Sequence, residues 1–316
     1  MKKIVVTGAL GHIGSRLVRE LPRAFPGCEI VMIDDFSTQR YSSLFNLPDG
    51  ARFRFLETDV QTADLAPIIE GAHALVHLAA ITDAASSFEK AEQVEQVNFA
   101  ATVRVANFCA AAGVPLLFLS TTSVYGTQSE VVDEDCPESD LQPQSPYATS
   151  KLQAEKALAA IGGLRFVTCR FGTIFGTSPG MRFHTAVNKF IWQACQGLPI
   201  TVWSSALDQR RPYLDLEDGV RAIAFIIERD LFDGRVYNVL TLNATVREIV
   251  DAIRERVPEL AIKLVDARIM NQLSYTVSAE RFTRLGFTFT GDLKRAVADT
   301  VALLRNVASR DVRIAP

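Results

Sequence analysis

The sequence predicts an α/β protein built on a doubly wound parallel sheet, followed by a smaller α/β domain. Strand-like and helix-like segments alternate over the first 170 residues, which is typical of βαβ units. Several strand-like segments are continuous apolar runs, as expected for strands that helices cover on both faces. A glycine-rich turn follows the first strand directly, at residues 8–14.

The strands of the first half are short and rich in β-branched and other apolar residues. We expect them at Lys3–Thr7 and at residues 29–33, 52–56, 74–78, 115–120 and 165–170. Helical patterns lie between them, one over residues 13–23 and the longest over residues 89–112, where Ala, Val, Glu and Gln predominate. Strands and helices therefore follow one another in the order that a parallel sheet requires.

The alternation loosens after residue 170. Glycine and proline in the segment 172–180 predict a loop, helices are expected over 185–196 and 215–229, and strands at Ile200–Trp203 and 235–239. We therefore expect one domain over residues 1–170, rejoined by about 205–240. Residues 171–316 are expected to form mainly the second, smaller domain.

Composition excludes several classes of protein. The 316 residues include 33 basic and 36 acidic side chains, and no block of like charge indicates a nucleic-acid binder. No apolar run is long enough to cross a membrane. The five cysteines are widely spaced and predict reduced thiols in a cytoplasmic protein. The four histidines form no cluster, so no metal site is expected.

The glycine-rich turn predicts a dinucleotide site of the Rossmann type. Gly8, Gly11 and Gly14 form a G-x-x-G-x-x-G pattern between a strand and a helix. Glycines let the backbone approach a pyrophosphate, and the start of a helix offers free N–H groups to it. We expect His12 and Ile13 to contribute their main chain to this site.

Asp34 ends the second strand, twenty residues after Gly14. A carboxylate at this place accepts hydrogen bonds from the adenosine ribose and repels a 2′-phosphate. No lysine or arginine follows until Arg40, so the sequence predicts NAD rather than NADP. His77 is interpreted as a core histidine. Further cofactor contacts are expected where strands end, at Asp35, Asp59, Val60, Leu78, Ala79 and Ala80.

Tyr147 and Lys151 form the candidate catalytic pair. They are four residues apart at the start of a helical stretch and share one helix face. A free tyrosine is a poor base at neutral pH, but a nearby ammonium group favours its phenolate. Tyr147 could then take a hydroxyl proton from a substrate as hydride leaves the same carbon. Hydroxyl side chains at 120–123 end the fifth strand and face the same crevice.

These motifs together resemble the extended short-chain dehydrogenase/reductases, in particular the NAD-dependent epimerase/dehydratase group that acts on nucleotide sugars. The resemblance implies a Rossmann domain, a C-terminal substrate-binding domain and a homodimer through the helices at 89–112 and 147–160. It runs through residues 7–14, Asp34, 77–80, Asn98, 120–126, 145–151, 170–176, 211–218 and 237–239.

Carried over by position, the resemblance assigns roles to individual residues. It implies that Thr121 is the catalytic hydroxyl, Tyr147 the base and Lys151 its partner, and that Asn98 lies at the cofactor. Arg211 matches an arginine that contacts the substrate's diphosphate. The alternative for Arg211 is a structural ion pair with Asp215 or Asp218.

Departures from the family pattern are also informative. The family's dehydratases and decarboxylases carry acidic residues just after the catalytic hydroxyl, where this chain has Thr122 and Ser123. Dehydration needs a proton donor and a base there, so neither activity is expected. Thr173 replaces the asparagine that the family usually has. Further substrate contacts are expected at Thr122, Arg182, His184 and Asn188, although His184 could equally be a surface histidine.

The sequence thus favours an NAD-dependent nucleotide-sugar epimerase. Tyr147 would deprotonate a sugar hydroxyl, most simply at C4, and hydride would return to the opposite face of the ketone. A keto-sugar reductase or sugar dehydrogenase needs the same residues and remains an alternative. A non-catalytic NAD-binding regulatory protein is the third hypothesis, against which the intact Tyr147 and Lys151 argue.

Overall fold

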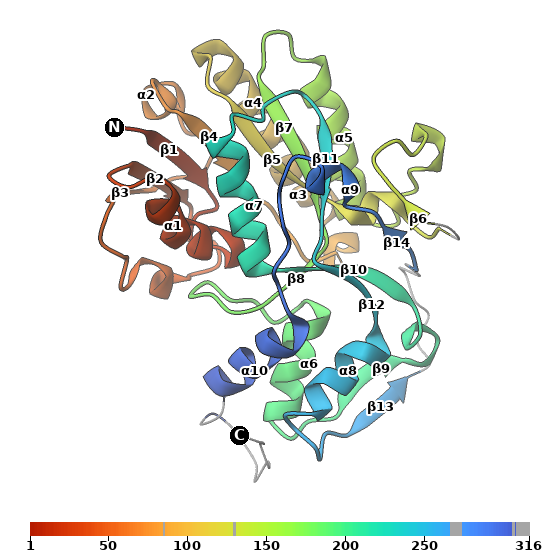
Figure 1. Ribbon diagram of the computed structural model, residues 1–316. Helices are drawn as coiled ribbons and strands as arrows, with labels where there is room; N and C mark the ends of the chain where they lie inside the picture. The colour runs from red at the N-terminus through yellow and green to blue at the C-terminus, as the bar shows by residue number, and fades with distance from the viewer. Residues whose placement is uncertain (85, 129–130, 266–273, 305–306, 308–316) are drawn as a thin grey trace.

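The computed structural model describes the chain except residues 85, 129–130, 266–273, 305–306 and 308–316 (Figure 1). Its centre is a seven-stranded parallel sheet in the order β11-β7-β5-β4-β1-β2-β3. The order reverses between β1 and β4, which is where open α/β sheets bind their ligands. The strands are β1 Lys3–Thr7, β2 Glu29–Asp34, β3 Arg52–Glu57, β4 Ala74–His77, β5 Leu116–Thr121, β7 Phe166–Phe171 and β11 Val236–Val239.

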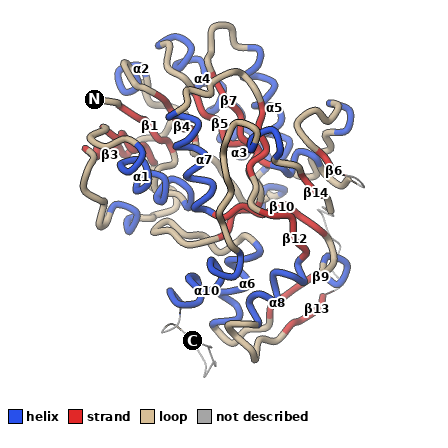
Figure 2. Tube along the Cα trace, viewed as in Figure 1, coloured by secondary structure: helices blue, strands red, loops and turns tan. Residues whose placement is uncertain are grey.

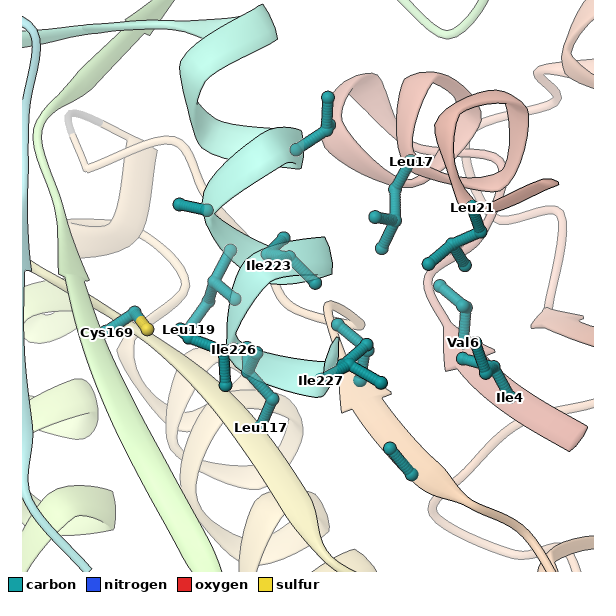
Figure 3. Packing of buried hydrophobic residues seen from close by; sticks show 14 of the residues in the cluster. Ile4, Val6, Leu17, Leu21, Leu117, Leu119, Cys169, Ile223, Ile226 and Ile227 are labelled. Atoms are coloured by element: carbon teal, nitrogen blue, oxygen red, sulfur yellow. The ribbon is translucent and has the colours of Figure 1, made fainter. Parts of the chain in front are cut away.

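Helices cover both faces of this sheet because successive strand residues point to opposite sides. Figure 3 shows the first face, where helices α1 (His12–Ala24) and α7 (Leu216–Glu228) pack on Ile4 and Val6 of β1. Helices α2 (Ala66–Ile69), α4 (Ala101–Ala112) and α5 (Pro146–Ala160) cover the other face, toward which Val5 points. The predicted doubly wound fold is confirmed.

The long helix expected over residues 89–112 is interrupted. Helix α3 (Ala91–Glu95) leads into a π-helical turn at Gln96–Ala100, and α4 follows. A π turn adds one residue to the helical repeat and re-aims the side chains beside it, and such turns are frequent at functional sites. Here the turn directs Asn98 toward the loop that follows β4, where it bonds the backbone of Ile81.

The C-terminal part forms a second core below the main sheet in Figure 2. The prediction of a loop over residues 172–180 is wrong for residues 173–175. These form a strand in which Ile174 pairs with Leu214. The elements of this part are β8 Thr173–Phe175, β9 Ile200–Trp203, β10 Arg210–Asp215, β12 Leu242–Thr245, β13 Ile262–Val265, α6 Ala186–Cys195, α8 Val246–Arg254 and α10 Leu293–Leu304. Strand β6 (Val131–Val132) pairs with β14 (Thr276–Val277), and α9 is Glu280–Thr283.

The chain passes between its two cores more than once. After β10 it returns as α7, which packs beside α1, and as β11, which pairs with β7 at the edge of the main sheet. Within the described residues, no helix combines the length and apolar character that a membrane span requires. The same part of the chain holds no group of His, Cys, Asp and Glu side chains arranged for a metal ion.

Candidate active site

A cavity of about 730 Å³ lies where β1, β2, β4 and β5 end, and it continues into the C-terminal part. Most of the predicted site residues line it. They are Gly8, Gly11, His12, Ile13, Gly14, Asp34, Asp35, Asp59, Val60, Leu78, Ala79, Ala80, Thr121, Tyr147, Lys151, Thr173, Arg182, His184 and Arg211. The topology therefore brings the predicted cofactor residues and most of the predicted substrate residues to one space.

The glycine-rich turn forms one end of the cavity, and its close contacts explain why glycine is needed. Gly8 has a φ of +63°, and a Cβ there would lie 2.6 Å from the Ala79 nitrogen. A Cβ on Gly14 would lie 2.4 Å from the Gly8 oxygen. Helix α1 begins after Gly11 without a side-chain cap, so its first N–H groups are available to an anion. This turn fits the pyrophosphate of a dinucleotide.

Asp34 closes the adenosine end of the site. Its Oδ2 accepts a hydrogen bond from the Leu10 nitrogen at 3.0 Å, and its Oδ1 accepts one from the Phe36 nitrogen at 3.1 Å. Burial raises the pKa of Asp34, while these backbone bonds lower it. Each carboxylate oxygen can accept a second hydrogen bond, so the group can still hold a ribose hydroxyl.

Replacing Asp34 with alanine is expected to relax the preference for NAD over NADP by about tenfold or more. The change removes a ribose acceptor and the negative charge that repels a 2′-phosphate. Titration of NAD and NADP by calorimetry measures the ratio, and Asp34→Asn separates the effect of charge from that of hydrogen bonding. An unchanged ratio in both variants would mean that Asp34 does not contact the ribose.

Arg40 is a cavity residue whose role the sequence did not reveal. It enters the prediction only as the first basic residue after Asp34, yet its Nη1 lies 3.7 Å from the Cβ position of Gly11. The guanidinium therefore stands over the glycine-rich turn. Its charge also acts on Asp34 and His12. The turn at Tyr41–Leu44 brings it there, and no local sequence pattern indicates this placement.

Arg40→Ala is expected to weaken binding of ADP by about tenfold and to leave adenosine binding unchanged, because the guanidinium stands over the glycine-rich turn that is expected to bind the pyrophosphate. Calorimetric titrations of the two ligands measure the difference. Arg23→Ala is the matched control, since Arg23 is exposed on α1 and pairs with Glu20. Equal losses for ADP and adenosine would exclude a phosphate contact.

The catalytic side chains come from β5 and from the start of α5. Ser145 caps α5 by accepting a hydrogen bond from the Ala148 nitrogen, and Pro146 begins the helix. These two residues fix Tyr147 in the first turn, where its side chain lines the cavity beside that of Thr121. Burial raises the pKa of Tyr147, whereas the charge of Arg182 and a hydrogen bond with Thr121 lower it.

Lys151 lies one helical turn after Tyr147 and is almost fully buried. Its Nζ is 4.7 Å from the centre of the Phe118 ring, a cation–π contact that favours the charged form. Burial lowers the pKa of Lys151 to about 7, and Glu155 acts in the opposite direction. Lys151 therefore changes charge near neutral pH in the free protein.

His77 is a core histidine, as predicted. Its Nδ1 bonds Thr7 at 2.8 Å and its Nε2 bonds Thr102 at 3.1 Å. Because the Thr102 hydroxyl donates to the carbonyl of Asn98, it accepts from Nε2, which carries the ring proton. Burial lowers the pKa of His77 to about 3, so the ring is neutral.

Three predicted contact residues are not among those that line the cavity. Asn98 bonds both backbone groups of Ile81 and holds the loop after β4. Thr122 is turned toward the Phe171 carbonyl and the Tyr275 hydroxyl, 3.2 Å away. Asn188 bonds the backbone of Gly176 and of Arg182. All three are buried and satisfied by the protein, so they position the walls of the site.

The segment after β8 rests directly on the glycine-rich turn. His12 Nδ1 bonds Ser178 Oγ at 2.8 Å, and the Gly180 nitrogen donates to Ser15 Oγ at 2.9 Å. A Cβ on Gly180 would lie 2.2 Å from the Leu10 oxygen. This packing brings Arg182 into the cavity, where it bonds Thr82.

Arg211 and Tyr275 line the part of the cavity that belongs to the C-terminal part. Asp218 forms its ion pair with Arg221 at 2.9 Å, and Asp215 caps α7. Tyr275 was not predicted because it lies more than a hundred residues after the catalytic segment and meets Thr122 only in the folded chain. Only the tertiary structure brings such residues together.

The parallel sheet, the glycine-rich turn and the Tyr147/Lys151 pair on one cavity define a dinucleotide-dependent enzyme of the extended short-chain dehydrogenase/reductase class. The model of the family described as "NAD dependent epimerase/dehydratase family" matches residues 4–239. The chain belongs to this family. Its cofactor is NAD, as predicted.

Individual relatives agree with this assignment. A protein of Bacillus subtilis (strain 168) named as an uncharacterized UDP-glucose epimerase, YtcB, is 32% identical over 247 residues, which are 75% of this chain and 76% of the relative. A UDP-glucose 4-epimerase of Azospirillum brasilense is 30% identical over 286 residues, or 80% and 77%. Among other relatives, a protein of Mus musculus is named as a dTDP-D-glucose 4,6-dehydratase, and one of Arabidopsis thaliana as a trifunctional 4,6-dehydratase, 3,5-epimerase and reductase.

Solved structures share the whole architecture. The structure of MoeE5 in complex with UDP-glucuronic acid and NAD is 28% identical in sequence and superimposes with a TM-score of 0.82. The alignment covers 96% of this chain and 99% of that one.

Proposed function

We propose that the chain is an NAD-dependent epimerase that inverts C4 of a UDP-sugar. The observation that carries the proposal is the complete set of Thr121, Tyr147 and Lys151 on the cavity that also holds the glycine-rich turn. Relatives named as UDP-glucose epimerase and UDP-glucose 4-epimerase support the substrate and the carbon. The neighbour solved with UDP-glucuronic acid and NAD supports a shared site for nucleotide sugar and cofactor.

In this proposal, Tyr147 removes the proton from the C4 hydroxyl and returns it at the end of the cycle. Thr121 holds the same oxygen by a hydrogen bond, and the ammonium of Lys151 favours the phenolate. NAD, when bound by the glycine-rich turn and Asp34, supplies a reversible hydride acceptor. The two epimers differ in the face of the C4 ketone to which hydride is returned. The pocket must therefore let the keto-sugar rotate so that its opposite face meets the cofactor.

The side chains after Thr121 favour epimerisation over dehydration. A dehydratase needs a carboxylic acid to expel a hydroxyl and a base beside the ketone. Here the Thr122 hydroxyl is hydrogen-bonded to the Phe171 carbonyl and the Tyr275 hydroxyl, and residue 123 is a serine. Asp83 lines the cavity, but it accepts a hydrogen bond from the Ser86 nitrogen. The structure thus offers no acid at the two positions where the family's dehydratases carry one.

The test is incubation of the purified protein with UDP-glucose and with UDP-glucuronic acid, without added cofactor. The proposal predicts that the C4 epimer of at least one accumulates to equilibrium without net formation of NADH. A product lighter by one water would support a dehydratase. In a parallel incubation with excess NAD, NADH formed one for one with an oxidised sugar would support the dehydrogenase alternative. Oxidation of added NADH by a UDP-keto-sugar would support the reductase alternative.

Three further expectations belong to the proposal. We propose that residues 1–170, with about 205–240, bind NAD and that residues 171–316 mainly bind the sugar nucleotide. Of the second range, residues 266–273, 305–306 and 308–316 lie outside the described part of the chain. We also propose a homodimer through the helical segments 89–112, which holds α3 and α4, and 147–160, which lies in α5; light scattering in solution tests it. The five cysteines are free, which supports a cytoplasmic location.

A further inference from the structure

A buried ion pair lies beside the catalytic helix and is not part of the cavity wall. Arg170 of β7 donates from Nη2 to Glu155 Oε2 at 2.7 Å and from Nε to Oε1 at 3.1 Å. Both side chains are only 6% exposed. Glu155 lies one turn after Lys151 and two turns after Tyr147, so all three share one face of α5.

Stability alone gives a weak reason for such a pair. Removing two charges from water is costly, and a buried ion pair often contributes no more than apolar residues of the same size. This pair also holds other groups in place. The Ser120 hydroxyl donates to Glu155 Oε1, and Ser120 immediately precedes Thr121. Arg170 lies 4.9 Å from the centre of the Tyr125 ring. The Glu155 carboxylate thus connects the strand that carries Thr121 to the helix that carries Tyr147.

The surroundings of Lys151 leave few sources of negative charge. On α5 itself the acidic group is Glu155, and β5 contributes the ring of Phe118. Strand β4 contributes His77, which is neutral and fully hydrogen-bonded. Helix α3 also packs against α5, but its acidic side chains are exposed; they are Glu92 and Glu95. Strand β7 contributes the positive Arg170, which Glu155 neutralises.

We propose that Glu155, held by Arg170 and Ser120 one helical turn from Lys151, is a positioning residue whose carboxylate favours the ammonium form of the Lys151 side chain. The role in catalysis rests on the proposed function, since it acts through the Tyr147/Lys151 pair. The effect on the charge of Lys151 is a property of the free protein and does not depend on any substrate.

The sign of the effect follows from the charges. Glu155→Gln removes the negative neighbour and leaves Arg170 positive, and both changes disfavour the ammonium form of Lys151. The pKa of Lys151, about 7 in the intact protein, should fall. The double variant Glu155→Gln with Arg170→Met also removes the uncompensated positive charge. Its Lys151 pKa should therefore lie above that of the single variant.

The experiment is an NMR titration of the free protein labelled with ¹³C at the lysine ε-carbon, with the Lys151 signal identified by its absence in Lys151→Met. We expect the pKa of Lys151 to fall by about one unit or more in Glu155→Gln and to recover in part in the double variant. Glu138→Gln is the matched control, because Glu138 forms an exposed ion pair with Lys156, which lies on α5 as Lys151 does. It should leave the pKa unchanged.

The outcomes separate this inference from the proposed function. An unchanged Lys151 pKa in a folded Glu155→Gln protein overturns the inference, whatever the protein catalyses. If Glu155→Gln does not fold, the double variant with Arg170→Met decides, since it removes both charges of the buried pair. A Lys151 pKa equal to the wild-type value then overturns the inference, and a lower pKa supports it. A lowered pKa together with no epimerisation of any UDP-sugar would leave the inference standing and reject the proposed function. With an active enzyme, the alkaline limb of kcat/KM should move to lower pH in the single variant and return part of the way in the double.

Discussion

Tyr147→Phe is expected to reduce turnover by about a hundredfold or more and to leave the fold and NAD binding nearly unchanged. The phenol oxygen is the group placed to move a proton at the substrate hydroxyl, and phenylalanine keeps the ring that fills the cavity wall. Thr121 retains a partner without it, because its oxygen accepts from the Ser123 nitrogen at 3.1 Å. Steady-state rates with the substrate found active, together with NAD titration, measure both parts.

The matched control for this variant is Tyr237→Phe. Tyr237 is also a buried tyrosine, but it lies on β11 and away from the cavity that holds Tyr147. Its hydroxyl donates to Asp233 at 2.7 Å. It should lower the melting temperature slightly and leave the rate unchanged. Wild-type turnover in Tyr147→Phe would remove Tyr147 from the mechanism. A rate loss in Tyr237→Phe of the same size would show that the assay responds to stability and not to chemistry.

Gly14→Ala is the second change with a large expected effect. The added Cβ would lie 2.4 Å from the Gly8 oxygen and 2.7 Å from the Ala9 Cα, both backbone atoms that no side-chain rotation can relieve. The turn must shift, so we expect NAD binding to weaken by about a hundredfold and stability to fall by about 1–3 kcal/mol. Calorimetric titration with NAD and thermal unfolding measure the two effects.

Gly162→Ala provides the control, because Gly162 has open space around its Cβ position and an ordinary φ. It should change neither NAD affinity nor stability appreciably. If Gly14→Ala bound NAD as tightly as the wild type, the close packing of the turn would be irrelevant to the cofactor. The assignment of the glycine-rich turn to the pyrophosphate would then be wrong.

Much of the fold could be predicted from the sequence because local patterns specify it. The strands of the main sheet read as short apolar runs, and the glycine-rich turn marks the point where β1 passes into α1. The interruption of the long helix at Gln96–Ala100 could not be predicted. It depends on Asn98 bonding the backbone of Ile81, seventeen residues earlier in the chain. Strand β8 was missed because its pairing partner, β10, lies still farther along the chain, with Tyr213 opposite Thr173.

The site was predictable to the extent that its residues follow the ends of strands. Asp34 and Thr121 are the last residues of β2 and β5 and line the cavity for that reason, whereas Tyr147 reaches it from the first turn of α5. Sequence patterns do not show which way a polar side chain points. Thr122 and Asn188 were therefore expected at the substrate, although their side chains are hydrogen-bonded to Tyr275 and Gly176 of the protein. Arg40 was missed because the turn that carries it folds back over Gly11.

In the proposed cycle, one bound NAD serves repeated turnovers and is restored in each. The most direct measurement is the cofactor content of protein purified without added NAD, determined after denaturation by chromatography and mass spectrometry. We expect about one NAD per chain, with the ratio unchanged after many turnovers of a UDP-sugar. Protein that is purified empty, binds NAD reversibly and releases NADH in proportion to product would contradict it.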